Sequence, residues 1–493
     1  MVGGALATSC ISITPQTMSE DVSTLKKSEV AGDDTLVTLI PMTSAQNNRY
    51  DGKVFVRTEF LTIPKGLNSP SNKIKSNILP SGWSSFTHPE GPIYYAKTYE
   101  NICVATDSAI DNPTVMATLQ TGIDLLLLLL KDITSEENCS DVEIYISTMP
   151  AATECYYYFV DHNDQTVFWV QDVDMTTLHM SPVSSETHIK SILQEHYWTH
   201  VEYFPHRSVP LCLRLELMDI LRHASADQMT SDNSTFPYHA EQCTKFAGLI
   251  DVQNKQTTIH MNCLVARIWV MIARHRYDHF YGEKCARLCR DQRVFDWTEV
   301  KPSFAKRLCS SILFDFPEII RNRLEDLYVD QIVYKIHWDN FINSTKRGWR
   351  ENALMCTGLL IANASFAGIH RNSSAMYTGL ASMMLSIGGL LSGFVLLHTY
   401  EHADKVNAAA TSAHLQDICS ENRGFRPIAA VFSLPKALTF WSILFFFFDV
   451  SITVGGSVSF VRVAIPLSVA MLVLVAFAMI VAILRRRSAA SMV

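Results

Sequence analysis

Long apolar runs gather toward the C-terminal end of the chain. The segments 353–369, 376–400, 437–454 and 463–484 each reach or approach the about 17 to 25 largely apolar residues that a membrane-crossing helix needs. They predict a transmembrane domain of about four helices in residues 351–493. The first segment is short and contains Thr357, Asn363 and Ser365, so its alternative interpretation is a re-entrant or interfacial helix.

A further leucine run, Leu125–Leu130, has a different setting. It lies within residues 115–133, is preceded by Gln120 and Asp124, and is closed by Lys131 and Asp132. The uninterrupted run is too short to cross about 30 Å of hydrocarbon. We therefore predict a buried helix outside the membrane.

Lysine and arginine residues set the expected orientation of the spans. An even number of crossings separates the segment before the first span, the loop between the second and third spans, and the segment after the fourth, so these three segments share one side of the membrane. They contain Lys346, Arg347, Arg350, Lys405, Arg423, Arg426, Lys436, Arg485, Arg486 and Arg487. Only Arg371 and Arg462 fall on the other side. Basic residues favour the cytosolic side, so we expect an integral membrane protein with both termini in the cytosol of a membrane that the sequence does not specify.

The remaining chain divides by pattern into three parts. Residues 176–350 place apolar residues at three- and four-residue intervals and predict a cytosolic helical domain. Residues 78–175 combine β-branched and aromatic runs with the leucine helix, and residues 1–77 are polar enough for a flexible leader. The expected fold class is α+β, mainly α.

Composition narrows the classes of function. The net charge is -7 and no long basic run occurs before the extreme C-terminus, which excludes a nucleic-acid surface. The 12 cysteines have no repeating framework, which favours a reduced compartment. Phosphate-loop, nucleophile-elbow and kinase motifs are absent from the sequence, so neither an enzyme nor a cofactor is predicted.

Two short segments resemble pieces of the WW domain, a three-stranded sheet that binds proline-rich peptides. Residues 79–95 contain Leu-Pro-Ser-Gly-Trp and Pro-Glu-Gly-Pro-Ile-Tyr-Tyr, and residues 158–169 read Tyr-Phe-Val-Asp-His-Asn-Asp-Gln-Thr-Val-Phe-Trp. Independently of the family, the turn cluster at 161–164 between two aromatic runs predicts a β-hairpin. Ala105 and Ser147 stand where the family pattern has tryptophan.

The resemblance implies a groove that stacks a polyproline-II ligand. Its residues would be Tyr158, His162, Thr166 and Trp169, with Trp83 and Tyr95 from the first piece. The alternative is that these aromatic residues form a strand pair packed on the Leu125–Leu130 helix. The whole arrangement, including Ser433–Leu438 (SLPKAL), also resembles a large group of membrane proteins from mushroom-forming (basidiomycete) fungi, and this second resemblance implies no activity.

Two histidine constellations have the composition of metal sites. His196 and His200 lie one helical turn apart beside Glu195, Glu202 and His206, and residues 275–289 contain His275, His279, Cys285 and Cys289. The first lacks the HExxH order, and four arginines surround the second. An aromatic packing helix and a helix pair with inward thiols are the preferred interpretations, so no metal is predicted.

Within the spans, Gly389 and Gly393 permit close helix contact with a neighbouring helix or a second copy of the chain. Asp449 and Arg462 flank a short turn, and we expect them to form an ion pair.

Three functions remain open. The first is a membrane-anchored cytosolic scaffold that binds a partner such as a proline-rich protein. The second is a channel or transporter with a cytosolic regulatory domain. The third is a metal-dependent membrane enzyme that uses one of the histidine clusters.

Overall fold

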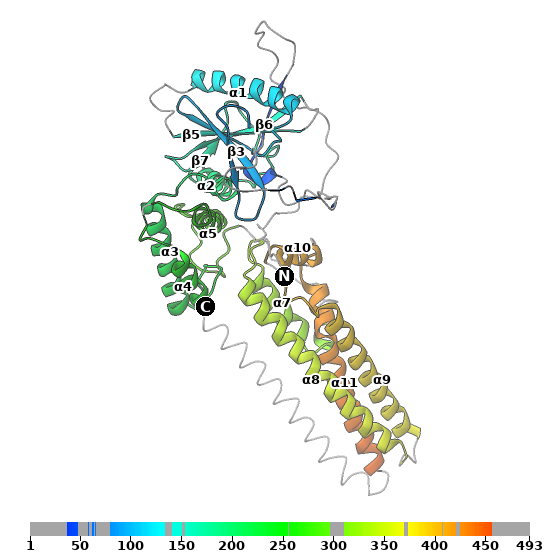
Figure 1. The fold of residues 1–493 in the computed structure, drawn as a ribbon. Coiled ribbons are helices and arrows are strands. Elements are labelled where there is room, and N and C mark those ends of the chain that lie inside the picture. Colours follow the sequence, from blue (N-terminus) through cyan, green and yellow to red (C-terminus); the bar gives the residue numbers. More distant parts are fainter. Residues whose placement is uncertain are drawn as a thin grey trace. The chain divides into compact units, whose positions relative to one another are not determined.

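The computed structural model describes residues 37–47, 79–133, 141–149, 153–254, 256–295, 310–368, 373–406, 408–420 and 424–455, with positions 58, 62, 63 and 65. They belong to two compact units, one within residues 13–294 and one within 295–493. The structure is mainly helical with a small mixed sheet, which agrees with the expected class (Figure 1).

A mixed sheet of seven strands organises the described part of the first unit. The strands run in the order β1-β6-β5-β4-β3-β2, and β7 also pairs with β6. Their bounds are β1 (Thr38–Pro41), β2 (Ser84–Thr87), β3 (Ile93–Tyr99), β4 (Ile102–Thr106), β5 (Val142–Thr148), β6 (Glu154–Asp161) and β7 (Thr166–Phe168). β4 and β5 are parallel, so they need a crossover, and α1 (Pro113–Ile133) supplies it.

Helices cover both faces of this sheet (Figure 1). Along β6, Tyr157 and Phe159 pack in one core with α1, whereas Tyr158 and Val160 pack in another with α2 (Glu186–Tyr203). α5 (Ile259–Asp278) packs against α2. The alternation follows from the two-residue period of a strand. Because helices cover both faces of the sheet, β6 has buried side chains on both faces.

The helical pattern predicted after residue 176 is present, and local signals explain where the helices begin. The Ser185 hydroxyl accepts a hydrogen bond from His188 N (3.1 Å) at the start of α2. The Thr258 hydroxyl accepts one from Met261 N (3.3 Å) at the start of α5. Between them lie α3 (Leu211–Thr230), preceded by Pro210, and α4 (Ala240–Leu249).

The second unit contains α7 (Phe316–Leu327), α8 (Lys335–Ala367), α9 (Ser373–Thr399), α10 (Ala408–Ile418) and α11 (Arg426–Gly455). α7 and all of α8 belong to this unit, so α8 runs across the domain boundary expected near residue 350. α8 is one continuous helix whose buried Trp338, Phe341 and Trp349 precede its apolar end.

Three described helices are long and apolar enough to cross a membrane: Pro113–Ile133, Ala375–Thr399 and Arg426–Thr453. In the first, Leu119, Leu126 and Leu130 are fully buried in a core shared with the sheet, as predicted for the leucine helix. The other two correspond to the expected second and third spans. The four-span prediction is not shown: the described part of the expected first span is the last part of the longer α8, which ends at Ala367, and 463–484 lie outside the described residues.

The predicted small-residue face lies between helices of the same chain. A Cβ built on Gly389 would lie 2.8 Å from Cys356 Sγ of α8 and 3.5 Å from Pro435 O of α11. Asp449 is buried, and its Oδ1 accepts a hydrogen bond from the Thr378 hydroxyl (3.4 Å). Arg462, its expected ion-pair partner, lies outside the described residues.

Part of the expected N-terminal leader is structured. β1 pairs in parallel with β6, and η1 (Ser44–Gln46), a short 3-10 helix, follows it. The prediction failed here because the apolar stretch Thr38–Pro41 is too short to stand out from its polar surroundings. The described part of residues 1–77 therefore contributes to the sheet.

Candidate metal centre

A buried carboxylate occupies the sheet face that α2 covers. Glu143 lies on β5, where Val142 and Ile144 point to the α1 side, so the strand alternation turns Glu143 toward α2. In the parallel ladder its partner on β4 is Cys103. The Glu143 side chain is 1% exposed, and an isolated carboxylate at such a site would be strongly unfavourable.

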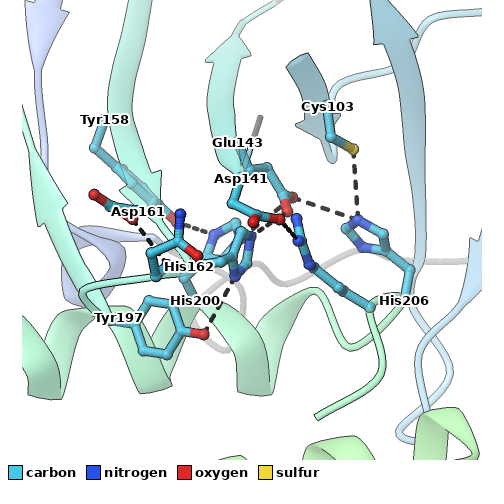
Figure 2. A network of polar contacts seen from close by, with 11 residues as sticks. Cys103, Asp141, Glu143, Tyr158, Asp161, His162, Tyr197, His200 and His206 are labelled. Atoms are coloured by element: carbon cyan, nitrogen blue, oxygen red, sulfur yellow. Dashed lines mark hydrogen bonds and ion pairs between the residues drawn. The ribbon is translucent and has the colours of Figure 1, made fainter. Parts of the chain in front are cut away.

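Three imidazoles surround this carboxylate (Figure 2). His162 Nε2 is 3.0 Å from Glu143 Oε2, while His200 Nε2 and His206 Nε2 are 3.3 Å and 3.5 Å from Oε1. His162 follows β6, His200 lies on α2, and His206 lies just after that helix. The Cys103 thiol completes the group, with its Sγ 3.7 Å from His206 Nε2. We call these five residues the Glu143 centre.

Two buried tyrosines fix the orientation of two of the rings. Tyr158 OH lies 3.1 Å from His200 Nδ1, and Tyr197 OH lies 3.2 Å from His162 Nδ1. The Nδ1 side of each ring is therefore occupied, and each Nε2 points at Glu143 (Figure 2). Metal-binding histidines show this arrangement, in which one nitrogen binds the ion and the other makes a hydrogen bond that orients the ring.

Hydrogen bonding does not account for all the polar atoms of the centre. Glu143 Oε1 and His200 Nε2 are buried and face each other at 3.3 Å, but they are too poorly aligned for a regular hydrogen bond. Two donor atoms bound at about 2.0–2.1 Å to a tetrahedral ion lie about 3.4 Å apart. His200 Nε2 and His206 Nε2 lie near this spacing from Glu143 Oε1, at 3.3 Å and 3.5 Å. The donor atoms of Cys103, Glu143 and His206 all lie within 4.8 Å of one another.

The pKa shifts of the carboxylate and of two imidazoles suit a cation, whereas burial and the Glu143 charge raise the pKa of the Cys103 thiol. Burial alone would raise the pKa of Glu143, but the charges of His206 and His200 and the hydrogen bond from His162 hold it well below its usual range. Burial lowers the pKa of His162 and of His206, with Glu143 opposing this effect. The lowered pKa values of Glu143, His162 and His206 all favour the deprotonated forms, which are the forms that bind a metal ion.

A pocket opens beside the centre. Its lining includes Asp141, His162, Tyr197, Arg207 and Ser208. Arg207 forms an ion pair with Asp141, and their side chains are 41% and 35% exposed. His162 thus belongs both to the centre and to the pocket wall.

The WW-like segments form core strands. Residues 79–95 contain β2 and the start of β3, and residues 158–169 contain the end of β6 and β7, which pair across the predicted turn. Both sets belong to one larger sheet, and the described residues show no separate three-stranded WW unit. The second predicted piece enters the centre through Tyr158 and His162.

The expected groove residues do not line one open surface. Tyr158 is fully buried and Trp83 is 6% exposed. Thr166 and Tyr95 are half-buried in strands, and the Trp169 indole N–H donates to Met42 O (3.0 Å). The burial of Tyr158 follows from the α2 cover, which the local resemblance does not include.

The structure brings together only part of the first histidine constellation. His200 and His206 belong to the centre, but His196 lies beside η1, where the Ser44 hydroxyl donates to its carbonyl oxygen (2.7 Å). Glu195 and Glu202 instead form ion pairs with Arg274 and Arg267, respectively. Glu143 and Cys103 were missed, and His162 was assigned to a peptide groove.

The second constellation does not form one group. His275 and His279 stack with ring centroids 4.1 Å apart. His279 is buried and His275 is half-buried, whereas Cys285 and Cys289 are exposed. The preferred interpretation, a helix pair with inward-packing thiols, is therefore wrong, and the four candidate ligands do not converge. Cys285 and Cys289 follow the end of α5 and lie outside the core that holds the imidazoles.

These stacked histidines predict a pH dependence of stability. Burial lowers the pKa of His275 to about 4, and burial with the charge of His275 lowers that of His279 to about 2. The unfolded chain, with pKa values of about 6.5, binds protons first as the pH falls. Between about pH 6.5 and 4 we expect a loss of up to about 1.4 kcal/mol per pH unit for each histidine. Denaturant unfolding at pH 7 and pH 5 measures it, and an equal loss in H275Q/H279Q would contradict the assignment.

No family model matches the chain, and no curated protein or solved structure matches it. The geometry itself defines the class of site: a buried carboxylate with three converging imidazoles and a thiol.

Proposed function

We propose that this chain is a membrane-anchored metalloprotein whose first unit binds one divalent transition-metal ion at the Glu143 centre. The observation that carries the proposal is the convergence of three imidazole Nε2 atoms on one buried carboxylate. This interpretation replaces the packing role preferred from the sequence. It draws on residues from β4, β5, the turn after β6, α2 and the segment after α2.

The donor set selects the class of ion. Calcium and magnesium prefer oxygen ligands, whereas imidazole nitrogen suits zinc, iron and other first-row transition ions. Cys103 adds a soft donor within reach, because its Sγ, a Glu143 oxygen and a His206 nitrogen lie within 4.8 Å of one another. We therefore expect a transition ion, with zinc as the simplest occupant.

The distribution of polarity in the second unit supports membrane anchoring. On α9 the large side chains of Leu380, Met384 and Leu391 are exposed, while Ser382 and Ser386 are fully buried. Exposed apolar and buried polar side chains suit a helix bundle surrounded by lipid.

One preparation tests both parts of the proposal. The full-length chain should stay in the pellet when membranes are washed with alkaline carbonate. From unwashed membranes, the detergent-solubilised chain should retain about one transition ion per chain by mass spectrometry of the elements. Glu143→Gln should lose the ion, whereas His223→Ala, which removes an exposed histidine of α3, should keep it. A wild-type chain that binds no more metal than Glu143→Gln would refute the centre.

Peptide scaffolding and transport stay predictions. Tyr158 and His162, two of the expected peptide-stacking residues, are engaged within the centre. The geometry therefore supports metal binding better than a polyproline groove.

A further inference from the structure

The two oxygens of the Glu143 carboxylate have different neighbours. Oε2 lies 3.0 Å from His162 Nε2, in the geometry of a regular hydrogen bond. Oε1 has no aligned hydrogen bond among the described residues, although His200 Nε2 and His206 Nε2 lie 3.3 Å and 3.5 Å from it. The carboxylate therefore has one oxygen that is already satisfied and one that a cation can occupy.

The Cys103 thiol lies beside His206. Its Sγ is 3.7 Å from His206 Nε2, and the donor atoms of Cys103, Glu143 and His206 all lie within 4.8 Å of one another (Figure 2). Cys103 and Glu143 are partners in the parallel ladder of β4 and β5, so both side chains point to the same face of the sheet. These three donors are close enough together to share one ion, and His162 is not among them.

We infer that Cys103, Glu143 through its Oε1, and His206 bind the ion directly. His162 is then a positioning residue, which holds the carboxylate by its other oxygen. The inference rests on the proposed metal site and assigns the roles within it.

The charges of this ligand set balance those of a divalent ion. The Cys103 thiol loses its proton to water as the metal–sulfur bond forms, so a thiolate and the Glu143 carboxylate each contribute one negative charge. The sum is neutral, which suits a place where the side chains of Glu143 and His200 are each 1% exposed. A thiolate also selects zinc, cobalt or cadmium over magnesium and manganese.

His162 acts on the ion through the carboxylate. Its Nε2–H donates to Glu143 Oε2, and its Nδ1, 3.2 Å from the Tyr197 hydroxyl, accepts from that group. This chain fixes the plane of the carboxylate and keeps Oε1 directed toward His206. Both His162 and Tyr197 also line the pocket, so the chain links the pocket wall to a ligand of the metal. Outer partners of this kind typically change metal affinity by about 10- to 100-fold.

The test of the thiol uses the full-length chain in detergent with one equivalent of Co²⁺. Cobalt bound to a thiolate gives a charge-transfer band in the near ultraviolet in addition to its visible absorption. Cys103→Ser should lose this band, whereas Cys155→Ser should keep it, because Cys155 is buried on the α1 side of the sheet. His206→Ala should also abolish the band, which thiols elsewhere on the chain would retain.

The test of His162 compares two variants by titration with Co²⁺. His162→Leu should raise the dissociation constant about 10- to 100-fold, with the wild-type spectrum at saturation, because no ligand is removed. His162→Gln, whose amide N–H can donate to Oε2, should recover most of the affinity.

Each outcome has a separate meaning. If the wild type gives no protein-dependent Co²⁺ absorption, the proposed metal site itself is refuted. If Co²⁺ binds without a charge-transfer band, or the band survives in Cys103→Ser, the metal site stands and Cys103 is not a ligand. An altered spectrum or an unchanged affinity in His162→Leu, or equal affinities in the leucine and glutamine variants, would refute the positioning role.

Discussion

Replacing His200 by alanine should lower the affinity of the Glu143 centre for zinc by more than about 100-fold, and Tyr158→Phe should lower it by about 10- to 100-fold. His200 supplies a nitrogen directed at Glu143 Oε1. Tyr158 would not bind the metal itself. Its hydroxyl oxygen lies 3.1 Å from His200 Nδ1, so it can accept a hydrogen bond from the Nδ1–H group when Nε2 binds a metal. Competition with a chromophoric chelator measures both affinities on the full-length chain.

The chain provides a matched control for the tyrosine. Tyr157 is the preceding residue of β6, is equally buried, and faces the α1 side of the sheet. Its hydroxyl makes no hydrogen bond among the described residues. Tyr157→Phe should therefore leave metal affinity unchanged, and equal losses in the two phenylalanine variants would show that Tyr158 acts through packing alone.

The second large effect is expected in the helix bundle. Gly389→Ala places a methyl group 2.8 Å from Cys356 Sγ, a distance that forces one of the two helices to shift. Overpacking of this kind costs about 1–3 kcal/mol. Unfolding of the full-length chain with SDS in mixed micelles, followed by circular dichroism, should show a loss of this size relative to Gly358→Ala.

Gly358 is the appropriate reference because it lies on α8 and a Cβ there meets no atom within 4 Å among the described residues. Both substitutions gain the same helix propensity, about 0.8–1 kcal/mol, which the comparison cancels. Adding Cys356→Ala to Gly389→Ala should restore most of the lost stability. Equal stability of the two single variants would mean that α8 and α9 do not approach as closely as described.

Much of the local structure was predictable because it depends on nearby residues. The hairpin turn at 161–164 is a clear case, since Asp161 Oδ1 accepts hydrogen bonds from Asn163 N (2.8 Å) and Asp164 N (3.2 Å). The leucine helix was recognised as a buried element because polar residues interrupt and close the run. Length and hydropathy predicted the apolar helices at 376–400 and 437–454, and the structure has helices long and apolar enough to cross a membrane at both places.

The candidate site was only half predictable. The sequence shows the histidines of α2 and the loop after it, but Glu143 lies in a strand with alternating apolar residues, where a solvent-facing carboxylate is the ordinary expectation. Only the α2 cover turns that face into a core. The pairing of Cys103 with Glu143 joins two parallel strands across the whole of α1, and no local pattern specifies such a register.

Parallel pairing of β4 and β5 also sets when an ion can be captured during biogenesis. The donor atoms are distributed from Cys103 to His206, and they meet only after the sheet has formed and α2 has docked on it. A nascent chain must therefore release all of these segments from the ribosome before it offers a complete coordination shell. Metal insertion would then act as a late checkpoint, and it would cross-link distant segments much as a disulfide does in a secreted protein.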